Sequence, residues 1–243
     1  MNALTITLRL DGPLRLPIAY NYYIQSALYG AWREAFPTLH DEGYTDGTRS
    51  FRMFTFGPLQ GRYRVEGKEI QYTGPVSLEV RSPAAELMEQ LAAHLLEQGF
   101  LRLGRYELPV TDLRTADRLL FFPSARVRAL GPVTVHDTLP DGKTVYYAPT
   151  EERFGELLAE NLASKLQAAG TDAPAFLGFR TAGTPRKVVT TFKGLYVTGY
   201  TGTFLLEADP EAMGLLYYTG LGSRNSQGFG MFDIEEQPTD RRE

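Results

Sequence analysis

Residues 220–230 read Gly-Leu-Gly-Ser-Arg-Asn-Ser-Gln-Gly-Phe-Gly, so two Gly-hydrophobic-Gly triplets enclose five polar residues. A short helix is predicted before this loop, with Asp209 as its N-cap and Pro210 at its first position, and a strand over 229–234 after it. Glycines allow positive φ and close backbone approach, so exposed amide groups, helped by Arg224, are expected to face an anionic backbone. The alternative interpretation is a glycine-rich helix-to-strand turn with polar decoration.

The loop matches neither of two common phosphate-binding motifs. It lacks the Gly-Lys-Ser/Thr of a Walker A loop, and it leaves a helix where a dinucleotide fingerprint would open one. Its glycines therefore predict contact with a polyanion but not the binding of a nucleotide cofactor.

The half of the chain that ends in this loop follows a β…α-β-β-α-β order. Its hydrophobic periodicity predicts these elements: strands at 119–130, 132–137 and 145–147, a helix at 150–169 with Thr150 as its N-cap, a hairpin formed by 187–192 and 194–207, and the short helix and strand that flank the loop.

The first half predicts the same supersecondary order. Its expected elements are a strand at 3–10, a helix at 20–35, strands at 51–56, 60–66, 69–73 and 75–81, a helix at 83–98 with Ser82 as N-cap and Gly99 as C-cap, and strands near 100–109. The predicted fold is α+β, with tandem ferredoxin-like (RRM-like) βαββαβ domains and antiparallel sheets, at 1–117 and 118–243. Internal sequence identity is too weak to prove a duplication.

Composition excludes several kinds of chemistry. The 243 residues include no cysteine and three scattered histidines, which excludes disulfides and thiolate nucleophiles and disfavours a histidine-rich metal site. No apolar run approaches the length needed to cross a bilayer and no signal peptide is apparent, so we expect a cytoplasmic protein without membrane contact. A net charge of −4 disfavours binding to polyanions through the bulk field, so any nucleic-acid contact must be local.

The glycine-rich loop and three motifs of the first half resemble those of known protein families. The glycine-rich loop resembles the signature loop of the RAMP proteins of CRISPR systems, which are built from ferredoxin-like domains. The stretch 22–29 (YYIQSALY), then His40, then 51–56 (FRMFTF), resembles the CRISPR precursor-RNA processing endoribonuclease family. These motifs occur in the family's order over nearly the whole chain.

The resemblance implies metal-independent cleavage of CRISPR repeat RNA, which releases guide RNAs for antiviral defence and leaves 2′,3′-cyclic phosphate and 5′-hydroxyl ends. In such a reaction the substrate's own 2′-OH attacks the adjacent phosphate. Catalysis then needs a base, an acid for the leaving 5′-oxygen, and a cation or donor for the developing charge. We therefore expect no metal and no cofactor.

Carried over by motif, the family's catalytic tyrosine, histidine and lysine fall on Tyr29, His40 and Arg52. An arginine stays protonated, so Arg52 can stabilise the phosphorane but cannot easily shuttle a proton, and His40 would carry more of the acid–base work. A surface tyrosine and a solvated or capping histidine are the alternatives. His94 and His136 do not fit the motif, and packing and a structural hydrogen bond are expected for them.

A local surface for RNA is expected despite the acidic total. The stretch 173–206 has four cations, interleaved with aromatic residues, and no acidic residue, a composition that suits backbone neutralisation and base stacking. The alternative is that the aromatics pack into a sheet core. The expected RNA-binding residues are Arg180, Arg186, Lys187, Lys193, Gly220, Gly222, Ser223, Arg224, Asn225, Ser226, Gln227, Gly228 and Gly230. A second basic cluster is formed by Arg49, Arg52, Arg62 and Arg64.

Two other functions stay open at this point. A non-catalytic protein that binds repeat RNA, or a scaffold subunit of a CRISPR ribonucleoprotein, is favoured by the arginine at position 52. A tandem module that binds a small molecule or a protein is the third hypothesis. A CRISPR effector complex and a second copy of the chain are further partners compatible with the sequence, which fixes neither the repeat recognised nor the position of the cut.

Overall fold

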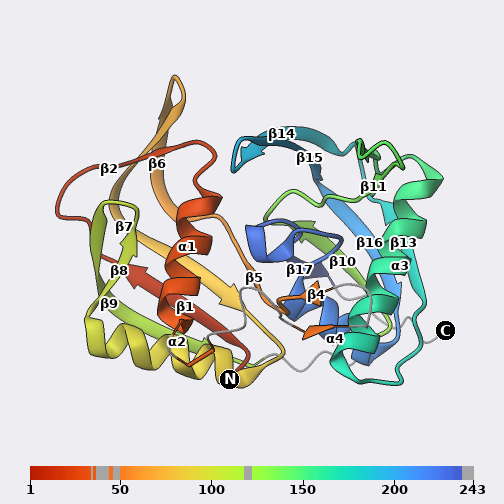
Figure 1. The fold of residues 1–243 in the computed structure, drawn as a ribbon, viewed down its shortest axis with the longest axis horizontal. Helices are drawn as coiled ribbons and strands as arrows, with labels where there is room; N and C mark the ends of the chain where they lie inside the picture. Colours follow the sequence, from red (N-terminus) through yellow and green to blue (C-terminus); the bar gives the residue numbers. More distant parts are fainter. Residues whose placement is uncertain (34, 37–43, 46–49, 118–121, 237–243) are drawn as a thin grey trace.

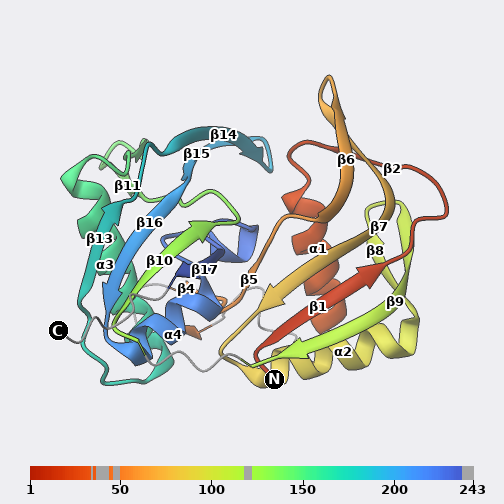
Figure 2. The same ribbon diagram turned by 180° about the vertical axis from the view of Figure 1, so that it is seen from behind.

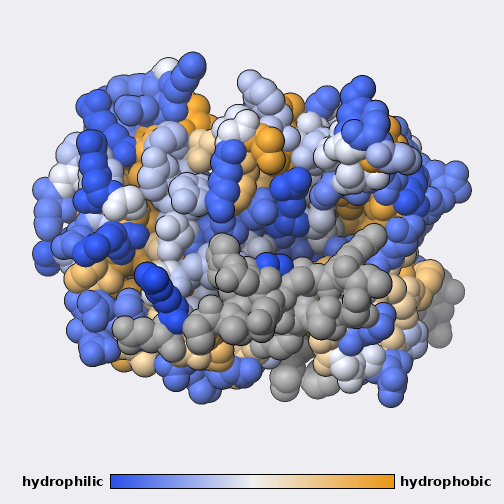
Figure 3. Space-filling view, in the orientation of Figure 1, coloured by the Kyte–Doolittle hydropathy of each residue, from blue (hydrophilic) through white to orange (hydrophobic). Residues whose placement is uncertain are grey.

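The computed structural model describes residues 1–33, 35–36, 44–45, 50–117 and 122–236. The chain forms an α+β structure whose two largest sheets are antiparallel, one in each half, and lie side by side (Figure 1). None of the helices in these ranges is long and apolar enough to cross a membrane. Figure 3 shows hydrophilic residues gathered at the centre of the face seen in Figure 1, where the halves meet.

The N-terminal half has a seven-stranded sheet covered by two helices, and a separate two-stranded sheet formed by residues 44–45 and 50–51. Its elements are β1 (Ala3–Leu8), β2 (Leu14–Pro17), α1 (Asn21–Trp32), β3 (Tyr44–Thr45), β4 (Ser50–Phe51), β5 (Thr55–Phe56), β6 (Gln60–Glu66), β7 (Glu69–Arg81), α2 (Ala85–Gln98), β8 (Phe100–Leu103) and β9 (Tyr106–Ala116). The strand order is β2-β7-β1-β9-β8, and β5 and β6 also pair with β7. Figure 2 shows this sheet from the face opposite α1 and α2.

Alternation along β1 explains why the helices cover one face of the sheet. Leu4, Ile6 and Leu8 are buried and point to the same side, because successive side chains of a strand point to opposite faces. Ile24 and Leu28 of α1, one turn apart, complete the same core.

The predicted strand 51–56 is wrong as a continuous element. Met53 has a positive φ of 48°, so the chain kinks between β4 and β5. Ser82, which follows β7 directly, fixes the kink to the end of that strand, because its hydroxyl donates to Met53 O at 2.7 Å. Ser82 is correspondingly not the N-cap of α2, which begins at Ala85, whereas Gly99 ends that helix in the left-handed conformation, as predicted.

The C-terminal half has a smaller sheet with the strand order β13-β16-β10-β17. Its elements are β10 (Ser124–Ala129), β11 (His136–Thr138), β12 (Thr144–Tyr146), α3 (Glu152–Ala169), β13 (Leu177–Thr181), β14 (Arg186–Phe192), β15 (Leu195–Thr201), β16 (Thr203–Ala208), α4 (Pro210–Thr219), the 3-10 turn η1 (Asn225–Gln227) and β17 (Phe232–Glu236). Asp209 caps α4 by accepting from Glu211 N, as predicted.

Two predictions for this half need correction. The expected strand 194–207 breaks at Gly202, which has a φ of 148°. Its first part, β15, pairs with β14 in a separate hairpin, and its second part, β16, joins the main sheet between β13 and β10. The N-cap of α3 is Glu151 rather than Thr150.

Arg81 joins the two halves. It ends β7, it is 1% exposed, and its guanidinium donates to Phe232 O at 2.7 Å and to Asp233 Oδ1 at 2.8 Å. Glu79 pairs with it at 2.6 Å, and the Tyr217 ring lies 4.0 Å from the guanidinium carbon. These contacts fix β7 of the N-terminal half to β17 and α4 of the C-terminal half.

Replacing Arg81 should destabilise the fold more than replacing an exposed arginine. Arg81→Met leaves partly buried carboxylates and a carbonyl without their donor, so we expect a loss of about 2–4 kcal/mol in the free energy of unfolding, measured in urea. Arg114→Met is the matched control, because Arg114 pairs with Asp112 while 81% exposed and should cost under ~0.5 kcal/mol. Equal stability of the two variants would contradict the interface described here.

Candidate functional site

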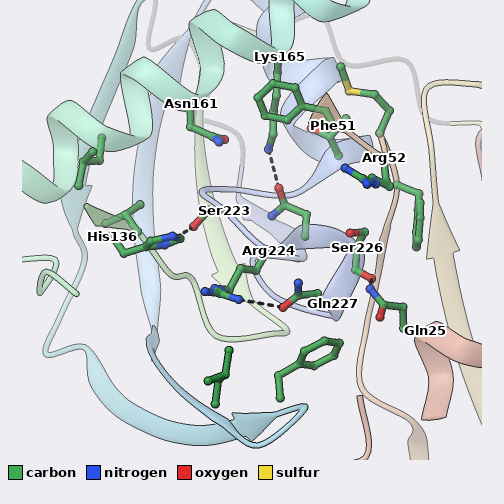
Figure 4. A pocket seen from close by; sticks show the side chains of 18 of the residues that line it. Gln25, Phe51, Arg52, His136, Asn161, Lys165, Ser223, Arg224, Ser226 and Gln227 are labelled. Atoms are coloured by element: carbon green, nitrogen blue, oxygen red, sulfur yellow. Dashed lines mark hydrogen bonds between the residues drawn. The ribbon is translucent and has the colours of Figure 1, made fainter. Parts of the chain in front are cut away.

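A cavity of about 830 Å³ lies where the two halves meet. The N-terminal half contributes residues of α1 and the kink at 51–54, and the C-terminal half contributes β11, α3, the tip of the β14–β15 hairpin and the glycine-rich loop. Figure 4 shows Arg52 and Gln25 on one side of this space, His136 on the other, and the loop between them. His40, the third predicted catalytic residue, lies outside the described residues.

Tyr29 and Arg52, two of the predicted catalytic residues, are brought together on the N-terminal side. The Tyr29 ring packs edge-on against Trp32 and Phe54, with centroids 6.4 and 5.7 Å away. Its hydroxyl hydrogen-bonds with the side chains of Arg52 and Ser226. Burial raises the pKa of Tyr29 above its ordinary value, and the positive charge of Arg52 and the two hydrogen bonds oppose that rise without cancelling it. The phenol therefore stays protonated at neutral pH.

The glycines of the loop are explained by close packing. A β-carbon on Gly230 would lie 1.9 Å from Leu221 O, and one on Gly222 would lie 2.5 Å from Thr134 O. On Gly228 it would meet Asn21 Nδ2 and the Phe56 ring at 2.6 Å. These three glycines also have positive φ angles, which other residues adopt only with strain. The loop keeps this path only without side chains at these positions.

Most amide groups of the loop are used inside the protein. The donors with internal carbonyl acceptors are Gly220, Leu221, Ser223, Gln227, Gly228 and Gly230. The expectation of a row of amides facing an anionic ligand is therefore not supported for these six. What the loop presents to the cavity is the side chains of residues 223–227.

The loop is also tied to the helix that carries Tyr29. Gln25 Nε2 donates to Ser226 O at 2.8 Å, and Asn21 Nδ2 donates to Gln227 O at 2.8 Å. Asn21, Gln25 and Tyr29 are spaced by four residues and share one face of α1. One face of α1 therefore holds the loop backbone in place and also carries the Tyr29 phenol.

His136 also lines the cavity, although the sequence predicts only a structural hydrogen bond for it. That bond is present, since His136 Nδ1 lies 3.2 Å from Ser223 Oγ. The Ser223 hydroxyl donates its one proton to Thr134 O at 3.0 Å, so the histidine Nδ1–H must be the donor to Oγ. The ring is thereby held on the C-terminal side of the cavity.

Lys165 of α3 is a residue of the cavity that the sequence prediction missed. It is 2% exposed and donates to Gly220 O, Gly222 O and Asn225 Oδ1 of the loop. One signal was present in the sequence, because Lys165 falls on the apolar side of its helix, beside Leu162 and Leu166. A lysine at such a position needs buried hydrogen-bond acceptors.

The predicted basic residues separate into two groups. Lys193, at the tip of the β14–β15 hairpin, lines the cavity, and its ammonium lies 5.2 Å from the centroid of the Tyr22 ring. Arg180 lies on β13, and Arg186 and Lys187 begin β14 at the opposite end of the hairpin; none of these three lines the cavity. The hairpin therefore brings one of the four predicted cations to the site.

The interleaved aromatics are mostly core residues. Phe179 and Tyr200 pack against Phe154, so the alternative interpretation holds for these two. Phe192 is buried but also lines the cavity, where its ring packs edge-on against Tyr22 of α1. Tyr196 is 75% exposed and remains available for stacking.

Two further features bear on the chemistry of the cavity. Within the described ranges, no group of three or more His, Asp or Glu side chains is arranged to hold a metal ion. Of the second predicted basic cluster, Arg52 lines the cavity, whereas Arg62 and Arg64 lie on β6 and do not. Arg49 lies outside the described residues.

A methyl group added to the loop should disrupt it. Gly230→Ala combines the contact with Leu221 O and a φ of 74°, so we expect at least ~3 kcal/mol of destabilisation in urea unfolding. Gly214→Ala, in α4 with open space around its β-carbon, is the control and should be neutral or stabilising by about 0.5–1 kcal/mol. If both variants keep wild-type stability, the packing described for the loop is wrong.

Known proteins resemble the chain over nearly its full length. Residues 15–114 match the family model "CRISPR-associated protein Cas6, N-terminal", and residues 120–234 match "CRISPR associated protein Cas6, C-terminal". The CRISPR-associated endoribonuclease Cas6 1 of Methanocaldococcus jannaschii is 29% identical over 238 residues, which are 93% of this chain and 90% of that protein.

Solved structures agree. One described as CRISPR associated protein Cas6 has a TM-score of 0.79 and 26% identity, with 97% of this chain and 99% of that one covered. Another, described as a RAMP protein binding different RNA substrates, has a TM-score of 0.82 at 18% identity, with 97% and 100% covered, and supports the fold alone. Since the N- and C-terminal models of one family match in sequence order and the fold is shared, the chain belongs to the Cas6 family of CRISPR-associated endoribonucleases.

Proposed function

We propose that this chain is an endoribonuclease that cleaves CRISPR repeat RNA and releases guide RNAs. The observation that carries the proposal is the cavity between the two halves, where Tyr29 and Arg52 meet the polar part of the glycine-rich loop. Such a cavity offers hydrogen-bond donors and a fixed cation at one point, as attack on a phosphate requires. Relatives that carry the name endoribonuclease support the assignment.

The proposed chemistry is attack by the 2′-OH on the adjacent phosphate, without a metal ion, to give 2′,3′-cyclic phosphate and 5′-hydroxyl ends. Arg52 would stabilise the charge that develops on the phosphorane, since its guanidinium is a permanent cation with several donors. Tyr29 would orient the 2′-OH rather than remove its proton, because its pKa is raised and it keeps its own proton.

Proton transfer in this proposal falls to His40. A histidine gains and loses a proton near neutral pH, whereas a tyrosine with a raised pKa and an arginine both keep theirs. His40 belongs to the motif that resembles the family, and in the sequence it falls between α1 and the kink that carries Arg52. We propose that it acts as acid, base or both on the same phosphate.

The RNA would cross the loop between the two sides of the cavity. Ser223, Arg224, Ser226 and Gln227 are proposed to contact it through their side chains, and Lys193 would neutralise a phosphate from the hairpin above. Asn225 and the glycines 220, 222, 228 and 230 would act by shaping the loop. Arg180, Arg186 and Lys187 are proposed to contact RNA outside the cavity.

We further infer that residues 1–117 and 118–243 form two ferredoxin-like (RRM-like) domains. In both halves the first strand of the βαββαβ pattern lies between the third and the fourth, since β1 lies between β7 and β9, and β10 between β16 and β17. Both helices of the pattern are connections between strands in the expected places.

The proposal is tested by incubating the protein with the repeat RNA of its own CRISPR array in excess EDTA. We expect cleavage at one position, products with a cyclic phosphate, and no cleavage when the scissile nucleotide is 2′-deoxy. Binding without cleavage would replace the enzyme with the non-catalytic RNA-binding alternative. Failure to bind at low salt, where phosphate contacts are strongest, would reject both.

Variants test the assignment of residues in the same assay. Tyr29→Phe removes the hydroxyl and should slow cleavage by about 10²-fold, as His40→Ala should, while RNA binding persists. Tyr106→Phe is the matched control, because Tyr106 lies on β9 and does not line the cavity. Unchanged cleavage by Tyr29→Phe or His40→Ala would remove that residue from the proposed site.

A further inference from the structure

Lys165 carries a buried positive charge that the proposed chemistry does not use. Its three ammonium N–H groups have three acceptors: Gly220 O at 2.7 Å, Asn225 Oδ1 at 2.8 Å and Gly222 O at 3.2 Å. All three belong to the glycine-rich loop, and only a charged ammonium can donate to all of them. Figure 4 shows the Lys165 side chain reaching from α3 toward the loop.

No carboxylate in the described part of the chain offsets this charge. Burial lowers the pKa of Lys165, and no acidic partner contributes to it, whereas the three acceptors favour the charged form. An apolar side chain of similar length would avoid the cost of removing a charge from water, but it would leave these three buried acceptors without a donor. What the lysine adds is therefore a loop whose carbonyl groups and Asn225 side chain are held in one arrangement.

Asn225 connects Lys165 to the rest of the loop. That residue accepts from Lys165 and donates to Leu221 O at 3.2 Å and Phe229 O at 3.1 Å, so it links the two limbs of the loop. The next residue, Ser226, accepts from Gln25 through its backbone and hydrogen-bonds the Tyr29 hydroxyl through its side chain. A continuous set of contacts leads from Lys165 to Tyr29.

We propose that Lys165 is a positioning residue, whose hydrogen bonds to the loop carbonyls and Asn225 hold Ser226 in place against Tyr29. The proposal rests on the proposed function for its effect on RNA cleavage. Its effect on the loop does not, because the contacts are present without RNA. The two can therefore be measured separately.

The loop is measured first, by hydrogen exchange of residues 219–231 in the protein without RNA. Lys165→Met keeps the length of the side chain and removes its donors, so the amides of Gly228 and Gly230 should exchange at least tenfold faster than in wild type. Lys143→Met, at an exposed lysine away from the loop, is the control and should change nothing. Unchanged exchange of these amides in Lys165→Met would overturn the proposal.

Cleavage is measured next, as a single-turnover rate with enzyme in excess over repeat RNA. Lys165→Met should be at least tenfold slower than Lys143→Met when both are compared at a temperature where they are fully folded. Its melting temperature should also fall, because three buried acceptors lose their donor. Lys165→Gln keeps two donors and should recover part of the rate. A purely structural lysine would lower the melting temperature but leave the rate of the folded protein unchanged, which would overturn the proposal.

The outcomes separate the two proposals. Faster loop exchange with a wild-type cleavage rate would overturn the positioning role. A wild-type protein that neither binds nor cleaves repeat RNA would overturn the proposed function, while the exchange result would still decide whether Lys165 holds the loop.

Discussion

The path of the glycine-rich loop requires glycine at three positions, because no side chain fits there. At Gly222, Gly228 and Gly230 a β-carbon would collide with backbone or ring atoms, so the loop can lie against α1 and the neighbouring backbone only as glycine. This close approach lets Gln25 and Asn21 bond to the loop backbone. The cavity, its polar lining and the contact between Ser226 and Tyr29 all follow from that packing.

The two halves have separate hydrophobic cores, and a few polar contacts hold them together around one cavity. Arg81 bonds β7 to β17, and the face of α1 bonds to the loop about the cavity. Because these contacts come from residues far apart in sequence, the N-terminal half orients the phenol while the C-terminal half supplies the surface beside it. A cut at one position of an RNA needs this fixed geometry, since a small displacement of reacting groups costs much of the rate.

Much of the fold could be predicted from local patterns, and the failures have physical causes. Helix caps such as Asp209 and Gly99 and the alternation of β1 are local and were predicted correctly. The kink at Met53 and the break at Gly202 depend on tertiary partners and on which sheet the next strand joins, which periodicity does not record. Tyr29 and Arg52 were predicted by motif, and both line the cavity. Lys165 was missed because its acceptors, two backbone carbonyls and the Asn225 side chain, lie 55 to 60 residues away in the sequence.

We propose that repeat RNA lies in the cavity between Tyr29, Arg52 and the glycine-rich loop. The most direct test is an experimental structure of the protein with repeat RNA that carries a 2′-deoxy nucleotide at the scissile position. We expect the scissile phosphate within hydrogen-bond distance of the Arg52 guanidinium and the Tyr29 hydroxyl beside the 2′ position. The RNA backbone should lie against the side chains of Ser226 and Gln227. RNA bound to another surface, with the cavity unoccupied, would contradict it.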